Sequence, residues 1–275
     1  MKPKKHTLTA LATLMLASWA APNAYAHDPV FGLGPHTLYK GGVELHAGAH
    51  QEKSDSRNTE AELEIKYGIT GDWVAGIGTG YGRLEEGGDT QTGRTPTTLS
   101  SKYRFWRNDM PGAQESAAVL GRVILDDGDV GHHDVSRQGE DYLAGLTYGY
   151  EGRKWYRWAS IRHRFNRDGA NGAERPDKTK VDLVGGIRFT PTEYREPDWV
   201  WMLELNYEHT NRTNRVVEGL SRELGGDQLF LSPGLMWTYR NFAAKAGVQA
   251  EIYEDFPKGQ EADDYRALIE LEWHL

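Results

Sequence analysis

The sequence predicts an all-β fold, a transmembrane antiparallel up-and-down β-barrel of about twelve strands. Apolar and polar residues alternate along most of the chain, and a period of two sends successive side chains of a strand to opposite faces. The 275 residues include 32 Gly, 9 Trp and 14 Tyr at a mean hydropathy of -0.67. This polar yet aromatic composition suits strands that face lipid on one side and water on the other.

The N-terminal residues 1–26 have the pattern of a cleavable signal peptide. Lys2, Lys4 and Lys5 form a basic region, residues 8–19 form an apolar stretch, and Ala24-Tyr25-Ala26 is a small-x-small site for signal peptidase. Cleavage there makes His27 the mature N-terminus. Residues 27–42 are rich in Gly and Pro, so they are expected to lie at the periplasmic mouth or to enter the barrel as a plug, with a loose tether as the alternative. Residues 43–275 are expected to form the barrel.

Twelve segments carry the alternation, and polar or turn-forming residues separate them. Trp199, Trp201 and Leu203 share one face of such a segment, for example, while Glu204 lies on the other. A strand of roughly 9–12 residues is long enough to cross a bilayer when it is tilted. The predicted strands lie at 43–49, 61–69, 73–81, 99–105, 117–125, 142–150, 159–165, 181–189, 199–207, 229–239, 242–252 and 265–275.

The connections between these segments alternate in length. Long polar connections are predicted at 51–58, 83–96, 126–139, 166–177, 211–226 and 254–263, and shorter ones at 70–72, 107–114, 151–154, 190–198 and 240–241. Outer-membrane barrels have short periplasmic turns and long extracellular loops. The pattern therefore predicts the outer membrane of a Gram-negative bacterium, both termini in the periplasm, and contact with outer-membrane lipid and lipopolysaccharide. The alternative, a soluble β-sandwich or propeller, would have to hide its sheet edges or show a blade-length repeat.

The last predicted strand places Ile269, Leu271, Trp273 and Leu275 on one face. It resembles the C-terminal strand that the barrel-assembly machinery of the outer membrane recognises. The usual final residue of that strand is aromatic, and Leu275 departs from the pattern. The resemblance implies the barrel-assembly machinery as a partner.

Charged residues on the opposite, lumen-facing side segregate along the chain. If the barrel closes between its last and first strands, two walls of opposite charge face each other across the lumen. Such walls could pair into a salt-bridged filling, or they could form a polar pathway whose charges set selectivity. The acidic wall comprises Glu44, Glu62, Glu64, Glu204, Glu270 and Glu272, and the basic wall comprises Lys102, Arg104, Arg122, Arg162, Arg164 and Arg188.

The function expected from these walls is that of a porin-like channel or transporter for small solutes or ions, metal cations among them. Small barrels are filled by side chains whereas large ones hold an aqueous channel, so strand number leaves the two interpretations open. The alternative is a closed structural or ligand-binding barrel that acts through its extracellular loops.

Four histidines near the predicted mature N-terminus are candidate metal ligands. His27 would carry a free α-amino group beside its imidazole, and imidazole suits copper, zinc and nickel. The expected ions are copper or zinc, and no other cofactor is expected. The alternative is that these histidines are ordinary surface or lumen residues. The candidates are His27, His36, His46 and His50.

Enzymatic and nucleic-acid functions are not expected. A net charge of -8 disfavours nucleic-acid binding. An outer-membrane phospholipase needs Ser, His and a polar orienting residue together on the lipid-facing side. His163 is expected to face outward, but its neighbours Ser160 and Arg162 are expected to face inward.

The sequence His27-Asp28-Pro29-Val30-Phe31-Gly32-Leu33-Gly34-Pro35-His36, continuing to Glu44, resembles the start of a group of proteobacterial outer-membrane proteins regarded as transporters. The rest of the chain is similar to that group in general barrel character, and also to the barrels linked to the MetA pathway of phenol degradation. The resemblance implies transport of metal ions or small organic molecules across the outer membrane, and it assigns no binding residue.

Overall fold

The computed structural model describes residues 27–129, 139–168, 174–192, 196–217, 220–258, 260 and 262–275, so the predicted signal peptide lies outside the described residues. The described chain forms thirteen strands. They are β1 (Val43–Lys53), β2 (Arg57–Thr70), β3 (Trp73–Glu86), β4 (Asp89–Arg94), β5 (Thr98–Met110), β6 (Ala113–Ile124), β7 (Asp141–Gly152), β8 (Trp155–Phe165), β9 (Lys178–Ile187), β10 (Asp198–Val217), β11 (Leu220–Tyr239), β12 (Phe242–Asp255) and β13 (Tyr265–His274).

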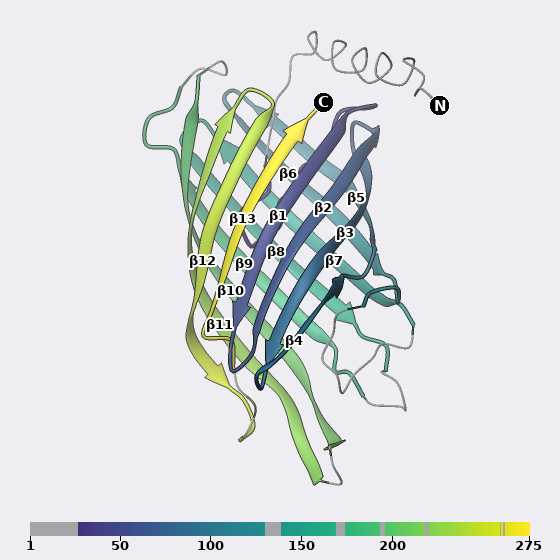
Figure 1. The fold of residues 1–275 in the computed structure, drawn as a ribbon. Helices are drawn as coiled ribbons and strands as arrows, with labels where there is room; N and C mark the ends of the chain where they lie inside the picture. Colours follow the sequence, from purple (N-terminus) through teal and green to yellow (C-terminus); the bar gives the residue numbers. More distant parts are fainter. Residues whose placement is uncertain are drawn as a thin grey trace, which may run out of the picture.

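Twelve of these strands close into one antiparallel barrel (Figure 1). β1 pairs with β13 on one side and with β2 on the other, which joins the two ends of the chain, and β2 in turn pairs with β3. β4 pairs only with the outer half of β3, as the return strand of a hairpin, and lies outside the closed ring. The predicted fold class is therefore confirmed, because closure leaves no strand edge unpaired in the barrel.

The outward face of the barrel is apolar on one strand after another. Leu63 is 64% exposed, and Trp201 and Leu203 are each 53% exposed. A soluble monomer does not present so large a contiguous apolar surface to water, whereas a transmembrane barrel presents it to lipid. Within the part of the chain that the structure describes, no helix has the length and apolarity needed to cross a membrane.

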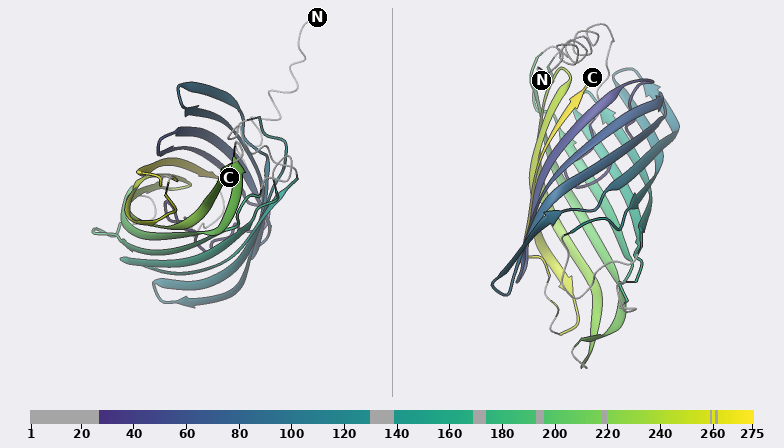
Figure 2. Two further views of the ribbon diagram at one scale, coloured as in Figure 1. Left: turned by 90° about the horizontal axis from the view of Figure 1, so that it is seen from below. Right: turned by 45° about the vertical axis from the view of Figure 1, so that its right-hand side comes forward.

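The two ends of the barrel differ. The turn end holds the two-residue connections at 71–72, 111–112, 153–154 and 240–241, the connection from β9 to β10 and the C-terminal residue, and the loop end holds the β3–β4 and β10–β11 hairpins (Figures 1 and 2). The connection at 240–241 is a two-residue turn in which Arg240 adopts a φ of 53°. At the loop end, the hairpin of β10 and β11 projects beyond the other strands (Figure 1).

Three of the predicted long connections contain more strand than the sequence pattern indicated. β10 and β11 each run for 20 residues and pair with each other to Val217 and Leu220, within the predicted connection at 211–226. β3 and β4 likewise fold the region 83–96 into a hairpin, and only residues 54–56 separate β1 from β2. These extensions hold together by backbone pairing beyond the apolar band, so their side chains carry no alternation of the kind that lipid imposes.

Part of the barrel interior is an apolar core near the turn end, which the expectation of a polar lumen did not include. Val200 is fully buried and Trp158 is 3% exposed, and both side chains belong to inward-facing positions of β10 and β8. The full cluster of buried residues is Val30, Tyr156, Trp158, Val184, Val200, Met202 and Met236, with Phe31 and Leu268 packed against it. Val30 and Phe31 come from the segment before β1, so this core joins that segment to the barrel wall.

The outward position of Leu203 can be tested by placing a charge there. Leu203 pairs with Gly185 and Pro233 in the middle of the β9–β11 region. We expect Leu203→Arg to lower the free energy of unfolding by about 2–4 kcal/mol, because this is the cost of an arginine facing the bilayer midplane. Urea unfolding in lipid vesicles measures the change. Thr90→Arg, on the exposed β3–β4 hairpin, is the control, and an equal effect of both substitutions would contradict a lipid-facing Leu203.

Candidate functional site

Residues 27–36, here called the plug, lie inside the barrel. The segment begins at the turn end, where His27 Nδ1 is 2.7 Å from Glu272 Oε2 of β13. It reaches the middle of the barrel at Gly32 and then returns, so that the Leu33 carbonyl accepts a hydrogen bond from Thr147 at 2.6 Å. At the exit, Tyr39 donates a hydrogen bond to the carbonyl of Leu275 at 2.6 Å.

Glu204 on β10 binds the innermost part of the plug. Its carboxylate accepts hydrogen bonds from the backbone N–H groups of Val30 and Gly32 at 2.8 Å and of Phe31 at 3.2 Å. Successive backbone amides that converge in this way form an anion-binding nest. Glu204 is fully buried, and a buried carboxylate requires such donors because it has lost its hydration. A Cβ at Gly32 would lie 3.1 Å from Val184 Cγ2, so glycine allows this close approach.

Asp28 anchors the opposite side of the plug. The Lys102 ammonium of β5 contacts both carboxylate oxygens of Asp28, at 3.0 and 3.2 Å, and also donates to the Gly34 carbonyl at 2.9 Å. Asp28 lies outside the strands. Burial raises the pKa of its carboxyl, but Lys102 and the neighbouring cationic side chains lower the pKa to about 2. Asp28 is therefore an anion that matches Lys102 at physiological pH.

The residues of the predicted acidic wall fall into two groups. Glu44, Glu62, Glu64, Glu270 and Glu272 lie together, because β1, β2 and β13 are neighbours in the barrel. Glu204 lies apart from them on β10, where it contacts the backbone of the plug.

The first of these groups is not purely acidic. Lys245 contacts both Glu270 and Glu272 at 2.7 Å, and Lys66 contacts Glu44 at 2.8 Å. Two lysines thus sit among the acidic residues and neutralise part of their charge.

The residues of the predicted basic wall are spread over the height of the barrel. Lys102, Arg122 and Arg162 line a common cavity. The other three lie elsewhere and are engaged in ion pairs: Arg104 with Asp72 at the turn end, Arg164 with Asp141 at the loop end, and Arg188 with Asp198 at the turn end.

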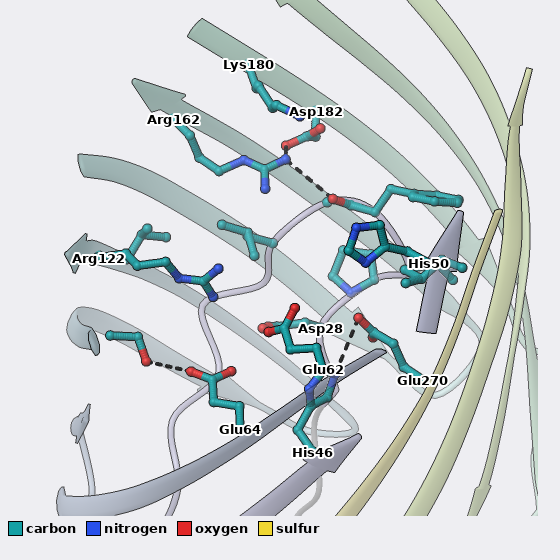
Figure 3. Close-up of a pocket in the computed structure, with 18 of the residues that line it drawn as sticks. Asp28, His46, His50, Glu62, Glu64, Arg122, Arg162, Lys180, Asp182 and Glu270 are labelled. Atoms are coloured by element: carbon teal, nitrogen blue, oxygen red, sulfur yellow. Dashed lines mark hydrogen bonds and ion pairs between the residues drawn. The ribbon is translucent and has the colours of Figure 1, made fainter. Parts of the chain in front are cut away.

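A cavity of about 330 Å³ separates the plug from the loop end. Figure 3 shows Arg122, Arg162 and Lys180 on one side of it and His46, Glu62 and Glu270 on the other. Arg162 pairs with Asp182 at 2.6 Å, and Glu64 accepts a hydrogen bond from Ser100 at 2.7 Å. Glu62 and Arg122, by contrast, form no hydrogen bond or ion pair with another described residue, and both line the cavity.

The four predicted metal-ligating histidines do not share one site. His36 contacts Glu151 of β7, His46 lies 3.3 Å from Glu270, and His50 lies 3.6 Å from Glu60. His27 instead lies against His274, with ring centroids 5.1 Å apart. His274 was not among the predicted ligands, although the alternation of the last strand places it on the same inward face as Glu270 and Glu272.

Ser160 and His163, the residues considered for a phospholipase site, lie apart from each other. Ser160 is buried and donates a hydrogen bond to Asp182 at 2.6 Å. His163 Nδ1 lies 2.8 Å from the Thr179 hydroxyl. The two side chains belong to opposite faces of β8 and do not meet.

The fold is similar to that of known outer-membrane barrels. An outer membrane channel from Pseudomonas putida F1 superimposes with a TM-score of 0.63 at 12% identity, over 91% of this chain and 100% of the channel. The NanC porin superimposes with a TM-score of 0.51 at 9% identity, over 84% of this chain and 98% of the porin. No protein-family model and no curated protein sequence matches the chain. The similarity therefore concerns the architecture, a twelve-stranded transmembrane barrel.

The docking of the plug on Glu204 predicts a specific effect of Glu204→Gln. Hydrogen bonds to a charged group contribute roughly 1.5–3 kcal/mol, so we expect hydrogen exchange at the amides of Phe31 and Gly32 to accelerate by about tenfold or more, since 1.4 kcal/mol is a factor of ten. Hydrogen exchange with mass spectrometry in detergent measures this. Glu254→Gln, on an exposed residue at the loop end of β12, should leave the exchange unchanged. Unaltered exchange in Glu204→Gln would show that the carboxylate does not hold the plug.

Proposed function

We propose that this protein is an outer-membrane channel for small charged solutes, whose lumen is narrowed by the plug. The observation that carries the proposal is the cavity on the loop side of the plug, where Glu62 and Arg122 form no hydrogen bond or ion pair with another described residue. Barrels held closed by their side chains pair their interior charges with one another. A carboxylate and a guanidinium that hold no such contact with the described residues around one cavity can instead bind a passing solute in turn.

The distribution of charge favours solutes that carry charge over neutral ones. Arg122, Arg162 and Lys180 lie on β6, β8 and β9, and Glu62 and Glu270 lie on β2 and β13, across the cavity (Figure 3). Charges of opposite sign on two sides create a transverse field in the lumen. Such a field orients an ionic or zwitterionic solute and sets the relative permeability of cations and anions.

The location that fits this function is the outer membrane of a Gram-negative bacterium, with the turn end in the periplasm. Short periplasmic turns and long extracellular loops are the rule for such barrels, and the β10–β11 hairpin at the loop end would then face the exterior. This location includes contact with lipopolysaccharide, export through the signal peptide at 1–26, and insertion by the barrel-assembly machinery through β13, the C-terminal strand.

A second candidate is a closed barrel that acts through its loops. It is favoured by the filling of the turn end, where the apolar core around Val200 and Trp158 packs against Val30 and Phe31 of the plug. In that case the projecting β10–β11 hairpin would carry the function, and the cavity would be a blind vestibule.

Single-channel recording in planar bilayers tests the channel proposal. We expect Glu62→Gln to lower the permeability of cations relative to anions, and Arg122→Gln to raise it. The ratio should change by up to about fivefold, because a unit charge at about 4 Å in water contributes about 1 kcal/mol. Asp89→Asn, at the exposed end of the β3–β4 hairpin, is the control and should leave the ratio unchanged.

Two results would contradict the proposal. The first is the absence of conductance steps from protein that is shown to be folded by its heat-dependent mobility in gels, which would favour the closed barrel. The second is a ratio of cation to anion permeability that stays unchanged in both Glu62→Gln and Arg122→Gln. The charges of the cavity would then not contact the permeating ions.

A further inference from the structure

The first residue of the plug meets the last strand of the barrel in a buried cluster at the turn end. His27, Glu272 and His274 are 6%, 4% and 6% exposed. The two imidazole rings meet edge to face, with centroids 5.1 Å apart. One ligand atom from each of the three residues lies within 4.8 Å of those of the other two. Of these three residues, only Glu272 also lines the cavity to which the channel proposal refers.

The hydrogen bond of His27 determines which of its nitrogens is free. Nδ1 lies 2.7 Å from Glu272 Oε2, and an ionised carboxylate can only accept, so Nδ1 donates. A neutral His27 then carries its lone pair on Nε2, a buried atom that has no hydrogen-bond partner among the described residues. Metal-bound histidines have the same arrangement, in which a carboxylate holds one ring nitrogen and the other binds the ion.

The surrounding donors match a transition-metal ion. Two imidazoles with carboxylate oxygens are a common ligand set for Zn²⁺, and imidazole also suits copper. Glu44 adds a further carboxylate, since its Oε2 lies 3.6 Å from His274 Nε2.

Lys245 and Lys66, which lie next to this cluster, do not take the place of a metal ion. Lys245 is shared between Glu272 and Glu270, at 2.7 Å from each. Lys66 likewise contacts Glu64 as well as Glu44. Lys66 therefore keeps Glu64 as a partner when Glu44 turns toward a metal, and Glu272 can stay on Lys245 and on His27 Nδ1.

We propose that His27 and His274 bind a divalent transition-metal ion such as Zn²⁺ or Cu²⁺, while Glu272 holds the His27 ring in place through Nδ1. Because His27 belongs to the plug and the other two residues belong to β13, the ion fastens the plug to the barrel wall at the turn end. The ligand set differs from the one expected from the sequence, since His36 and His46 contact other carboxylates, Glu151 and Glu270. The proposal does not depend on whether the barrel conducts.

Equilibrium dialysis of Zn²⁺ against the purified protein in detergent tests the site. We expect one high-affinity ion per chain, with affinity lowered by roughly tenfold or more in His27→Ala and in His274→Ala. Glu272→Gln should weaken binding by about 10–100-fold, as expected for a group that orients a ligand. His36→Ala, also on the plug, is the matched control and should bind as the unaltered protein does. His274→Gln, which keeps a polar side chain at this position, serves if His274→Ala does not fold.

Two further variants separate this site from its alternatives. A chain that begins at His27 and a chain that retains Ala26 should bind Zn²⁺ equally, because the ligands are imidazoles. A site built on the terminal amine would instead be lost when Ala26 is retained. His46 shares Glu272 with the proposed site in a second cluster that includes Glu270, and it also lies near Glu62 and Glu64. His46→Ala should leave the affinity unchanged if His27 and His274 are the imidazole ligands, and it therefore separates the two clusters.

Three results would overturn the proposal. They are the absence of Zn²⁺ binding by folded protein, affinity that is unchanged in both His27→Ala and His274→Ala, and affinity that is lost in His46→Ala alone.

Discussion

The arrangement of the barrel interior depends on the buried carboxylate of Glu204. A fully buried carboxylate is strongly destabilising unless hydrogen-bond donors replace its hydration. Part of this need is met by the three backbone amides of residues 30–32, which come from a segment more than 170 residues away in sequence. The plug is therefore as much a part of the folded interior as the strands, and its removal would take these three donors from the carboxylate.

The hydrogen bonds to Glu204 also bring the other residues of the plug to their partners. Once Val30 lies over the carboxylate, its side chain completes the apolar core with Trp158 and Met202. Asp28 then reaches Lys102 on β5, and His27 reaches Glu272 on β13. Polar and apolar contacts thus hold the same short segment from several directions, which leaves the cavity on the loop side of the plug as the space available to a solute.

Alternation along the chain was sufficient to predict the barrel and its closure. Lipid accepts only apolar side chains on the outward face, so residues such as Leu63, Trp201 and Leu203 carry a strong periodic signal. The inward face can hold either polar or apolar side chains. Trp158 and Val200 point inward and pack on the plug, and an interpretation that assigned every inward position to a polar lumen could not anticipate them.

The candidate site was harder to predict, because periodicity gives the face of a side chain but not its neighbours across the barrel. Adjacent strands placed Glu44, Glu64 and Glu270 near one another, as strand order implies. The lysines among them, Lys66 and Lys245, and the separate position of Glu204 depend on strand stagger and on the plug. The alternation of the last strand puts His274 on the same face as Glu270 and Glu272. Its contact with His27 could not be predicted, because it depends on the path that the plug takes through the barrel.

The central claim is that residues 27–36 occupy the barrel interior beside β9, and disulfide cross-linking tests it most directly. The chain has no cysteine, and a Cβ at Gly32 would lie 3.1 Å from Val184 Cγ2. The pair Gly32→Cys and Val184→Cys should form a disulfide in the folded protein, seen as a gel shift on reduction. The pair Gly32→Cys and Gly185→Cys should not, because residue 185 is exposed on the outer face. A disulfide in the second pair, or none in the first, would contradict this position of the plug.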